Sequence, residues 1–236
     1  MKKNILVAGS SGYVGGIITE YFKEKYEIYR LDSDSCDLRS ETGVANLSKK
    51  ISPDIIIHAA GNKDIKFCEA NPKEAHDANE LSVINLVKAF PEKTIIYISS
   101  DYVFAGNGGN YAELDDTAPK TVYGKSKLAG ETYGLKNSDS FIVLRASAIF
   151  DEKASFPVFL HGELLCNRDV ACFANTFYSP TYYEDFLATL EKIIENGTMK
   201  NKIYHSCGER VSRHEFGITY AEVFGFDRVL IKKKLC

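Results

Sequence analysis

The chain has no long hydrophobic run and no marked excess of charge of one sign. No stretch of its 236 residues approaches the roughly 20 apolar residues that a membrane-spanning helix requires. The apolar run Ile5–Ala8 is too short for the hydrophobic core of a secretion signal. The net charge of −3 gives no basic tract for nucleic acid and no basic face for a membrane. We therefore expect a cytoplasmic protein with neither nucleic-acid nor membrane partners.

Metal-binding and disulfide patterns are also missing. The six cysteines are scattered without a C-x-x-C pair, and the five histidines show no metal-ligand spacing. We expect reduced thiols and no metal site. The G-x-S-x-G elbow of many hydrolases and the G-x-x-x-x-G-K-[ST] loop of phosphotransferases do not occur either.

What the chain does have is a regular alternation of short β-branched runs and longer amphipathic segments. Strands are predicted at Ile5–Ala8, Glu27–Leu31, Asp54–His58, Thr94–Ser99 and Phe141–Arg145. Helices are predicted at Tyr13–Lys23, Lys73–Phe90 and Tyr123–Tyr133. This order predicts an α/β fold of the Rossmann type, with a doubly wound parallel sheet.

The pattern loosens after Phe150. Short strands are predicted at Val170–Phe173 and Lys202–His205, and helices at Tyr183–Asn196 and Ser212–Phe224. No Pro/Gly/Ser-rich linker separates this region from the rest. We therefore divide the chain into a dinucleotide-binding core, residues 1–150, and a small substrate-binding elaboration, residues 151–236, that does not fold independently.

A glycine-rich turn follows the first predicted strand. Gly9, Gly12 and Gly15 are spaced G-x-x-G-x-x-G, where a sharp turn would bring backbone N–H groups and a helix N-terminus to a pyrophosphate. The alternative is an ordinary tight turn between strand and helix. The predicted cofactor contacts in this turn are Gly9, Ser11, Gly12, Tyr13 and Val14.

The second predicted strand ends where the choice between NAD and NADP is made in such folds. Asp32 can accept a hydrogen bond from a ribose 2′-hydroxyl, whereas Arg30 or Arg39 can meet a 2′-phosphate. The cofactor is therefore NAD or NADP, with a slight lean to NAD. Further contacts are predicted from Asp37 and Leu38 at the adenine and from Ala59, Ala60 and Gly61 after the third strand.

Tyr123 and Lys127 form the candidate catalytic pair. Their spacing of four residues puts both side chains on one face of a helix. A lysine ammonium beside a phenol favours the phenolate, so we expect Lys127 to lower the pKa of Tyr123 and also to hold the nicotinamide ribose. Ser99 or Ser100, at the end of a strand, can donate a hydrogen bond to a substrate oxygen. The alternative is a solvent-exposed helix in which this spacing occurs by chance.

Together these motifs resemble the extended short-chain dehydrogenase/reductases, and within them the dTDP-4-dehydrorhamnose reductase-like group of nucleotide-sugar reductases. The resemblance covers nearly the whole chain. Its most specific segment is Ser99–Phe104, reading SSDYVF, and the catalytic helix matches over Pro119–Glu131. The chain departs from the group after Arg145, where a common tryptophan is missing, and in the segment before Pro180.

The resemblance implies NAD(P)H-dependent reduction of a keto group on a nucleotide-activated sugar, for cell-surface polysaccharide biosynthesis, by a homodimer. It assigns catalysis to Ser100, Tyr123 and Lys127. It places Asn79 and Ser99, with Tyr123 and Lys127, at the cofactor. It assigns substrate contacts to Asp101, Tyr102, Tyr123, Arg145 and Thr181. The dimer would form through the Tyr123 helix and the Lys73–Phe90 helix.

Two alternatives stay open. One is a nucleotide-sugar epimerase or dehydratase that recycles a bound NAD. Dehydratases of this kind commonly place an acidic pair or Asp-Lys after the strand-end serine or threonine, whereas this chain reads Asp101-Tyr102. The other alternative is a non-catalytic NAD(P)-binding regulatory subunit.

Overall fold

The computed structural model describes residues 2–196 and 201–236. The chain forms two compact units: Met1–Ala146 with Leu187–His205, and Ser147–Phe186 with Ser206–Cys236. The sequence placed its division at residue 150, whereas the units divide at Ala146 and the segment Leu187–His205 returns to the first unit. A substrate-binding role for the second unit stays a prediction.

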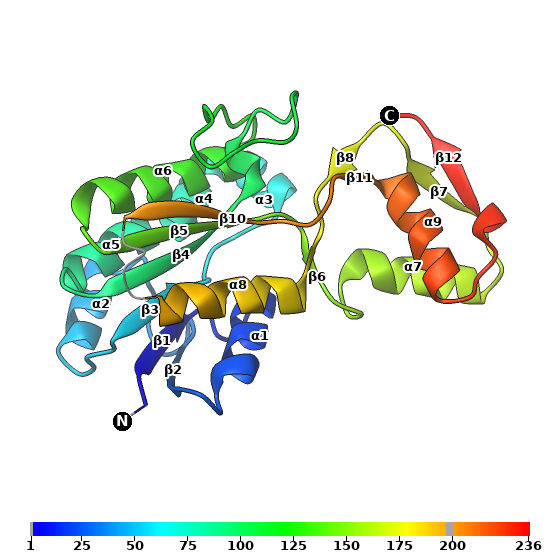
Figure 1. Cartoon of the computed structure of the whole chain (residues 1–236). Coiled ribbons are helices and arrows are strands. Elements are labelled where there is room, and N and C mark those ends of the chain that lie inside the picture. Colours follow the sequence, from blue (N-terminus) through cyan, green and yellow to red (C-terminus); the bar gives the residue numbers. More distant parts are fainter. Residues whose placement is uncertain (1, 197–200) are drawn as a thin grey trace. The chain divides into compact units, whose positions relative to one another are not determined.

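The first unit is built on a six-stranded sheet (Figure 1). Its strands are β1 (Asn4–Ala8), β2 (Glu27–Leu31), β3 (Ile55–His58), β4 (Thr94–Ser100), β5 (Phe141–Ala146) and β10 (Lys202–Ser206). Their order is β10-β5-β4-β3-β1-β2, and the pairs from β2 to β5 are parallel. The strand order reverses between β1 and β3, which is where such sheets bind ligands at the carboxyl ends of their strands. The predicted doubly wound parallel fold is confirmed.

Helices cover both faces of this sheet. One face carries α1 (Tyr13–Phe22) and the part of α8 (Tyr183–Glu195) that belongs to this unit, and Tyr21 of α1 donates a hydrogen bond to Glu191 of α8. The other face carries α2 (Glu41–Ser48), α5 (Ser82–Ala89) and α6 (Val122–Asn137), packed side by side. Because both faces are covered, the central strands are apolar throughout: every residue of β3 and β5 is buried.

The predicted helix Lys73–Phe90 is interrupted. It consists of α4 (Pro72–His76), a π-helical turn at Asp77–Leu81 and α5, and it follows a short helix, α3 (Ile65–Ala70), that the periodicity did not predict. The π turn contains Asn79, which is fully buried. The Asn79 amide donates to Asn62 O at 3.0 Å and to Ser126 Oγ at 2.9 Å. π-helical turns are rare and often occur at functional sites.

The second unit has a small core between two helices and a pair of strands. The helices are α7 (Ser155–Leu165) and α9 (Arg213–Val223), and β7 (Val170–Phe173) pairs in parallel with β12 (Ile231–Lys234). Two further pairs join β6 (Ile149–Phe150) to β9 (Thr181–Tyr182) and β8 (Phe177–Tyr178) to β11 (Val211–Ser212). Its buried core residues are Leu160, Leu164, Val170, Cys172, Ala221 and Ile231.

Short 3₁₀ turns at Asp101–Val103 and Arg228–Leu230 complete the described elements. Within the residues that the structure describes, no helix is both long and apolar enough to span a membrane.

Candidate active site

The glycine-rich turn joins β1 to α1 in a conformation that side chains would not fit. Gly9 has φ +84°, and a Cβ on it would lie 2.6 Å from Ala60 N. A Cβ on Gly15 would lie 2.1 Å from Gly9 O, so only glycine lets α1 start against the turn. The cap residue of α1 is Gly12, which has no side chain to bind the first N–H groups, and the first turn has no acidic residue. These features fit an anionic pyrophosphate at the start of α1.

A cavity of about 430 Å³ opens beside Gly9 in the first unit. Its volume lies in the range of ligand pockets. Five of the predicted cofactor contacts besides Gly9 line it: Asp32, Asp37, Leu38, Ala60 and Gly61. Arg39 and Lys63 add positive charge to its wall, and Lys63 Nζ lies 5.6 Å from the ring centre of Tyr13. The cavity therefore adjoins the glycine-rich turn and contains several of the residues predicted to contact the adenosine.

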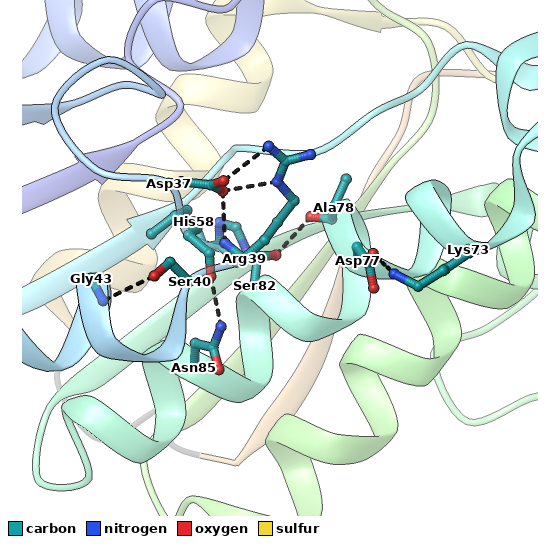
Figure 2. A network of polar contacts seen from close by, with 11 residues as sticks. Asp37, Arg39, Ser40, Gly43, His58, Lys73, Asp77, Ala78, Ser82 and Asn85 are labelled. Carbon is teal, nitrogen blue, oxygen red and sulfur yellow. Dashed lines mark hydrogen bonds and ion pairs between the residues drawn. The ribbon is translucent and has the colours of Figure 1, made fainter.

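Two acidic residues of this cavity are held by neighbours. The Asp37 carboxylate accepts hydrogen bonds from Arg39 Nε at 2.8 Å and Arg39 Nη2 at 2.9 Å, as Figure 2 shows. These bonds hold the pKa of Asp37 below its usual value. The Asp32 carboxylate accepts from Ser35 Oγ at 2.7 Å, which lowers the pKa of Asp32. Both groups are therefore anionic at neutral pH and can accept hydrogen bonds from ribose or adenine.

His58 ends β3 behind this cavity and has no solvent exposure. Its Nε2 lies 2.9 Å from Ser82 Oγ, and Ser82 in turn donates to Ala78 O, so Nε2 carries the proton (Figure 2). Burial lowers the pKa of His58 to about 3, and the ring is neutral at physiological pH. His58 is a structural residue that orients Ser82 on the cavity wall.

Tyr123 lies at the start of α6, whose cap residue Thr121 accepts a hydrogen bond from Gly124 N. The Tyr123 ring packs edge-on against Tyr102, with ring centres 5.5 Å apart. Burial raises the pKa of Tyr123 to about 12, against a smaller lowering by a hydrogen bond with Ser100. The predicted low pKa of Tyr123 is wrong, because burial outweighs the other influences on the phenol. Tyr123 is protonated at neutral pH, which is the form needed to donate a proton.

Lys127 points into the first unit from the next turn of α6. Its Nζ donates to Ile98 O at 2.6 Å and lies 3.9 Å from the ring centre of Tyr97. Burial lowers the pKa of Lys127 to about 7, although Glu131 raises it. The Lys127 ammonium is thus held between β4 and α6. Because its pKa lies near neutral pH, neighbouring charges strongly affect its protonation.

Seven other predicted site residues fall into three groups. Ser100 and Asp101 lie together where β4 ends, with Ser100 Oγ donating to Asp101 Oδ1 at 3.0 Å, and Tyr102 is half exposed beside them. Ser99, Asn79 and Arg145 are buried and bound to other side chains of the first unit. Thr181 lies in the second unit, where its hydroxyl is 2.6 Å from Ser147 O and 2.9 Å from Ser206 O. Site roles for all of these stay predictions.

Glu131, the partner of Ser99 and Arg145, was not predicted as a site residue. A signal for it was present in the sequence. It lies four residues after Lys127 and eight after Tyr123, on the same helix face.

The model of the family "RmlD substrate binding domain" matches residues 1–233. A dTDP-4-dehydrorhamnose reductase of Aggregatibacter actinomycetemcomitans is 33% identical, and the match covers 98% of this chain and 81% of that protein. The chain belongs to this family. The predicted membership of the dTDP-4-dehydrorhamnose reductase-like short-chain dehydrogenase/reductases is confirmed, and with it the assignment as an NAD(P)-dependent oxidoreductase.

Two further relatives bear on cofactor and function. The solved structure of a Bacillus anthracis dTDP-4-dehydrorhamnose reductase in complex with NADP has a TM-score of 0.93 and 25% identity, covering 100% of this chain and 85% of that one. The lean to NAD is therefore not supported. The methionine adenosyltransferase 2 subunit beta of Danio rerio is 26% identical over 94% of this chain and 74% of its own length. The homodimer stays a prediction.

We predict that Gly15→Ala weakens cofactor binding at least tenfold. The new methyl group would lie 2.1 Å from Gly9 O, so the turn must move away from the phosphate position. Titration of NADPH fluorescence measures the effect. Gly16→Ala is the matched control, because its Cβ would lie 3.8 Å from Ser10 O, an ordinary contact. Equal cofactor affinity in both variants would contradict binding of the pyrophosphate at the glycine-rich turn.

Proposed function

We propose that this protein reduces a keto group on a nucleotide-activated sugar with NADH or NADPH. The observation that carries the proposal is the Tyr123 phenol in hydrogen-bond contact with Ser100, at the carboxyl end of β4. Support also comes from the relatives named dTDP-4-dehydrorhamnose reductase. We assign nucleotide-activated sugars as the substrate class because these relatives are named for such a substrate.

In the proposed reaction, each part of the site has a separate role. The glycine-rich turn and the start of α1 bind the cofactor, which supplies a hydride when it is bound. Ser100 donates a hydrogen bond to the ketone oxygen and orients it. Tyr123 transfers its phenolic proton to that oxygen as negative charge develops there. Lys127 places a positive charge next to the same region, which favours the phenolate left after the transfer.

Turnover of dTDP-4-keto-6-deoxyhexoses with each reduced cofactor tests the proposal. The expected result is one reduced nicotinamide consumed for each ketone converted to an alcohol. Sugar conversion without net change in the nicotinamide absorbance would replace the proposal with a recycling epimerase or dehydratase.

A regulatory subunit is the second candidate, because the Danio rerio relative is named as a subunit of methionine adenosyltransferase. This candidate predicts tight NADP or NAD binding without turnover of any nucleotide ketosugar. It also predicts that Tyr123→Phe changes no measurable property of the protein. Calorimetric titration with cofactor, run beside the turnover assay, separates the two candidates.

We predict that Asp32→Ser shifts the cofactor preference toward NADPH by about tenfold in kcat/KM, because it removes a carboxylate that repels a 2′-phosphate and leaves Arg39 and Lys63 in place. The measurement is the ratio of kcat/KM for NADPH and NADH. Asp34→Ser is the matched control, since Asp34 is an exposed residue of the same turn and is not part of the cavity wall. An unchanged ratio in Asp32→Ser would show that Asp32 does not contact the ribose.

A further inference from the structure

Three residues of α6 are bound to three successive residues at the end of β4. Lys127 Nζ donates to Ile98 O at 2.6 Å. Glu131 accepts from Ser99 Oγ at 2.5 Å. The third pair is Tyr123 and Ser100, the proposed catalytic phenol and hydroxyl. Glu131 therefore holds the residue directly before Ser100.

Glu131 also binds the neighbouring strand. Arg145 on β5 is the cross-strand partner of Ser99, and its Nη2 lies 2.6 Å from Glu131 Oε2, with Nε 3.1 Å from both carboxylate oxygens. The two side chains are 3% and 1% exposed, so the pair lies in the interior of the first unit. Arg145 Nη1 reaches on to Glu113 O at 3.2 Å, in the loop that follows Phe104.

Glu131 lies one helical turn beyond Lys127, and it is the one described residue that raises the pKa of that lysine. Two titratable side chains close to Lys127 add no charge of their own. His58 is neutral, and Tyr97 keeps its proton because burial raises its pKa well above the usual value. The titratable or charged side chains that act on Lys127, on Tyr97 or on Glu131 are His58, Glu80, Tyr97, Tyr123 and Arg145.

We propose that Glu131 is a positioning residue: through Ser99 and Arg145 it fixes the end of β4 under Ser100, and its carboxylate, one helical turn from Lys127, favours the ammonium form of that lysine. This inference rests on the proposed function for its catalytic meaning. Its electrostatic part is independent of turnover. Without the negative charge of Glu131, the buried Lys127 would lose its proton at a lower pH, and with the proton its positive charge on the Tyr123 helix.

The test compares two variants that weaken the same ion pair. Glu131→Gln removes the negative charge and keeps the size and hydrogen bonding of the side chain. Arg145→Gln removes the positive charge and leaves Glu131. The titration of Lys127 is followed directly by NMR in protein labelled with ¹³C-lysine, with the resonance assigned by its loss in Lys127→Met.

We expect the Lys127 midpoint to fall by about one pH unit or more in Glu131→Gln and not to fall in Arg145→Gln. The alkaline limb of kcat/KM should move in the same directions. A midpoint that is unchanged in Glu131→Gln, or that falls equally in both variants, would overturn the inference. Should Glu131→Gln not fold, Glu131→Asp keeps the charge and is expected to keep the midpoint within about 0.3 units; a larger fall would count against the role of charge.

The two possible failures are distinguishable. If the proposed function is wrong, no variant turns over a ketosugar, but the Lys127 midpoint still responds to Glu131. If the inference is wrong, wild-type turnover is observed and the midpoint does not respond.

Discussion

Replacing Tyr123 by phenylalanine is expected to lower kcat about 1,000-fold or more while leaving cofactor affinity nearly unchanged. General acid catalysis by a positioned group contributes roughly 10²–10⁴-fold, and in the described site Tyr123 is the phenol beside Ser100. The variant keeps the aromatic ring and its contact with Tyr102, so the geometry of the site survives. Single-turnover kinetics with saturating cofactor measure the chemical step free of product release.

The control for this experiment is Tyr133→Phe, which makes the same chemical change on the same helix, away from β4's end. It should retain full kcat and cofactor affinity. A Tyr123→Phe variant that retains a tenth of the wild-type kcat would show that another group supplies the proton.

The second large effect concerns stability. Glu131→Leu is expected to lower the free energy of unfolding by about 3–5 kcal/mol, because it leaves the Arg145 guanidinium buried without its counter-charge. It also removes the acceptor of the Ser99 hydroxyl. Urea unfolding followed by circular dichroism measures the change, and the slope of the transition shows whether unfolding stays cooperative.

The double variant Glu131→Leu/Arg145→Met completes the cycle. Replacing both charges of a buried pair by apolar side chains of similar volume is often neutral or stabilising. We therefore expect the double variant to recover most of the stability lost in Glu131→Leu. A single variant that loses less than about 1 kcal/mol would show that water reaches the pair.

The elements that the sequence predicted are those whose signals are local. The β-branched runs of β1 to β5 and the glycine spacing before α1 each carry their own pattern, and the structure places them within a few residues of the prediction. The break in the Lys73–Phe90 helix was not predictable in this way. The π turn at Asp77–Leu81 accompanies the burial of Asn79 against Asn62 and Ser126, and these partners are distant in sequence.

In the candidate site, too, local features could be predicted from the sequence and features that depend on distant contacts could not. The i, i+4 spacing of Tyr123 and Lys127 was sufficient to place both on one helix face. The spacing could not predict the protonation state of these groups, because protonation depends on burial, which periodicity on one helix does not reveal. Lys127 bonds to Ile98, 29 residues away, and Arg145 bonds to Glu131, 14 residues away. Such contacts follow only from the pairing of β4 with β5 and the packing of α6 on them.

The path of the chain between its units bears on synthesis and on gene exchange. The chain leaves the first unit after Ala146, re-enters it after Phe186 and leaves it again after His205. During translation, β5 therefore keeps an unpaired edge until β10 has been made, and such edges favour association between nascent chains. Recombination between relatives can replace the second unit only through three separate joints, after Ala146, after Phe186 and after His205. A gene fusion with a single crossover would divide one of the units.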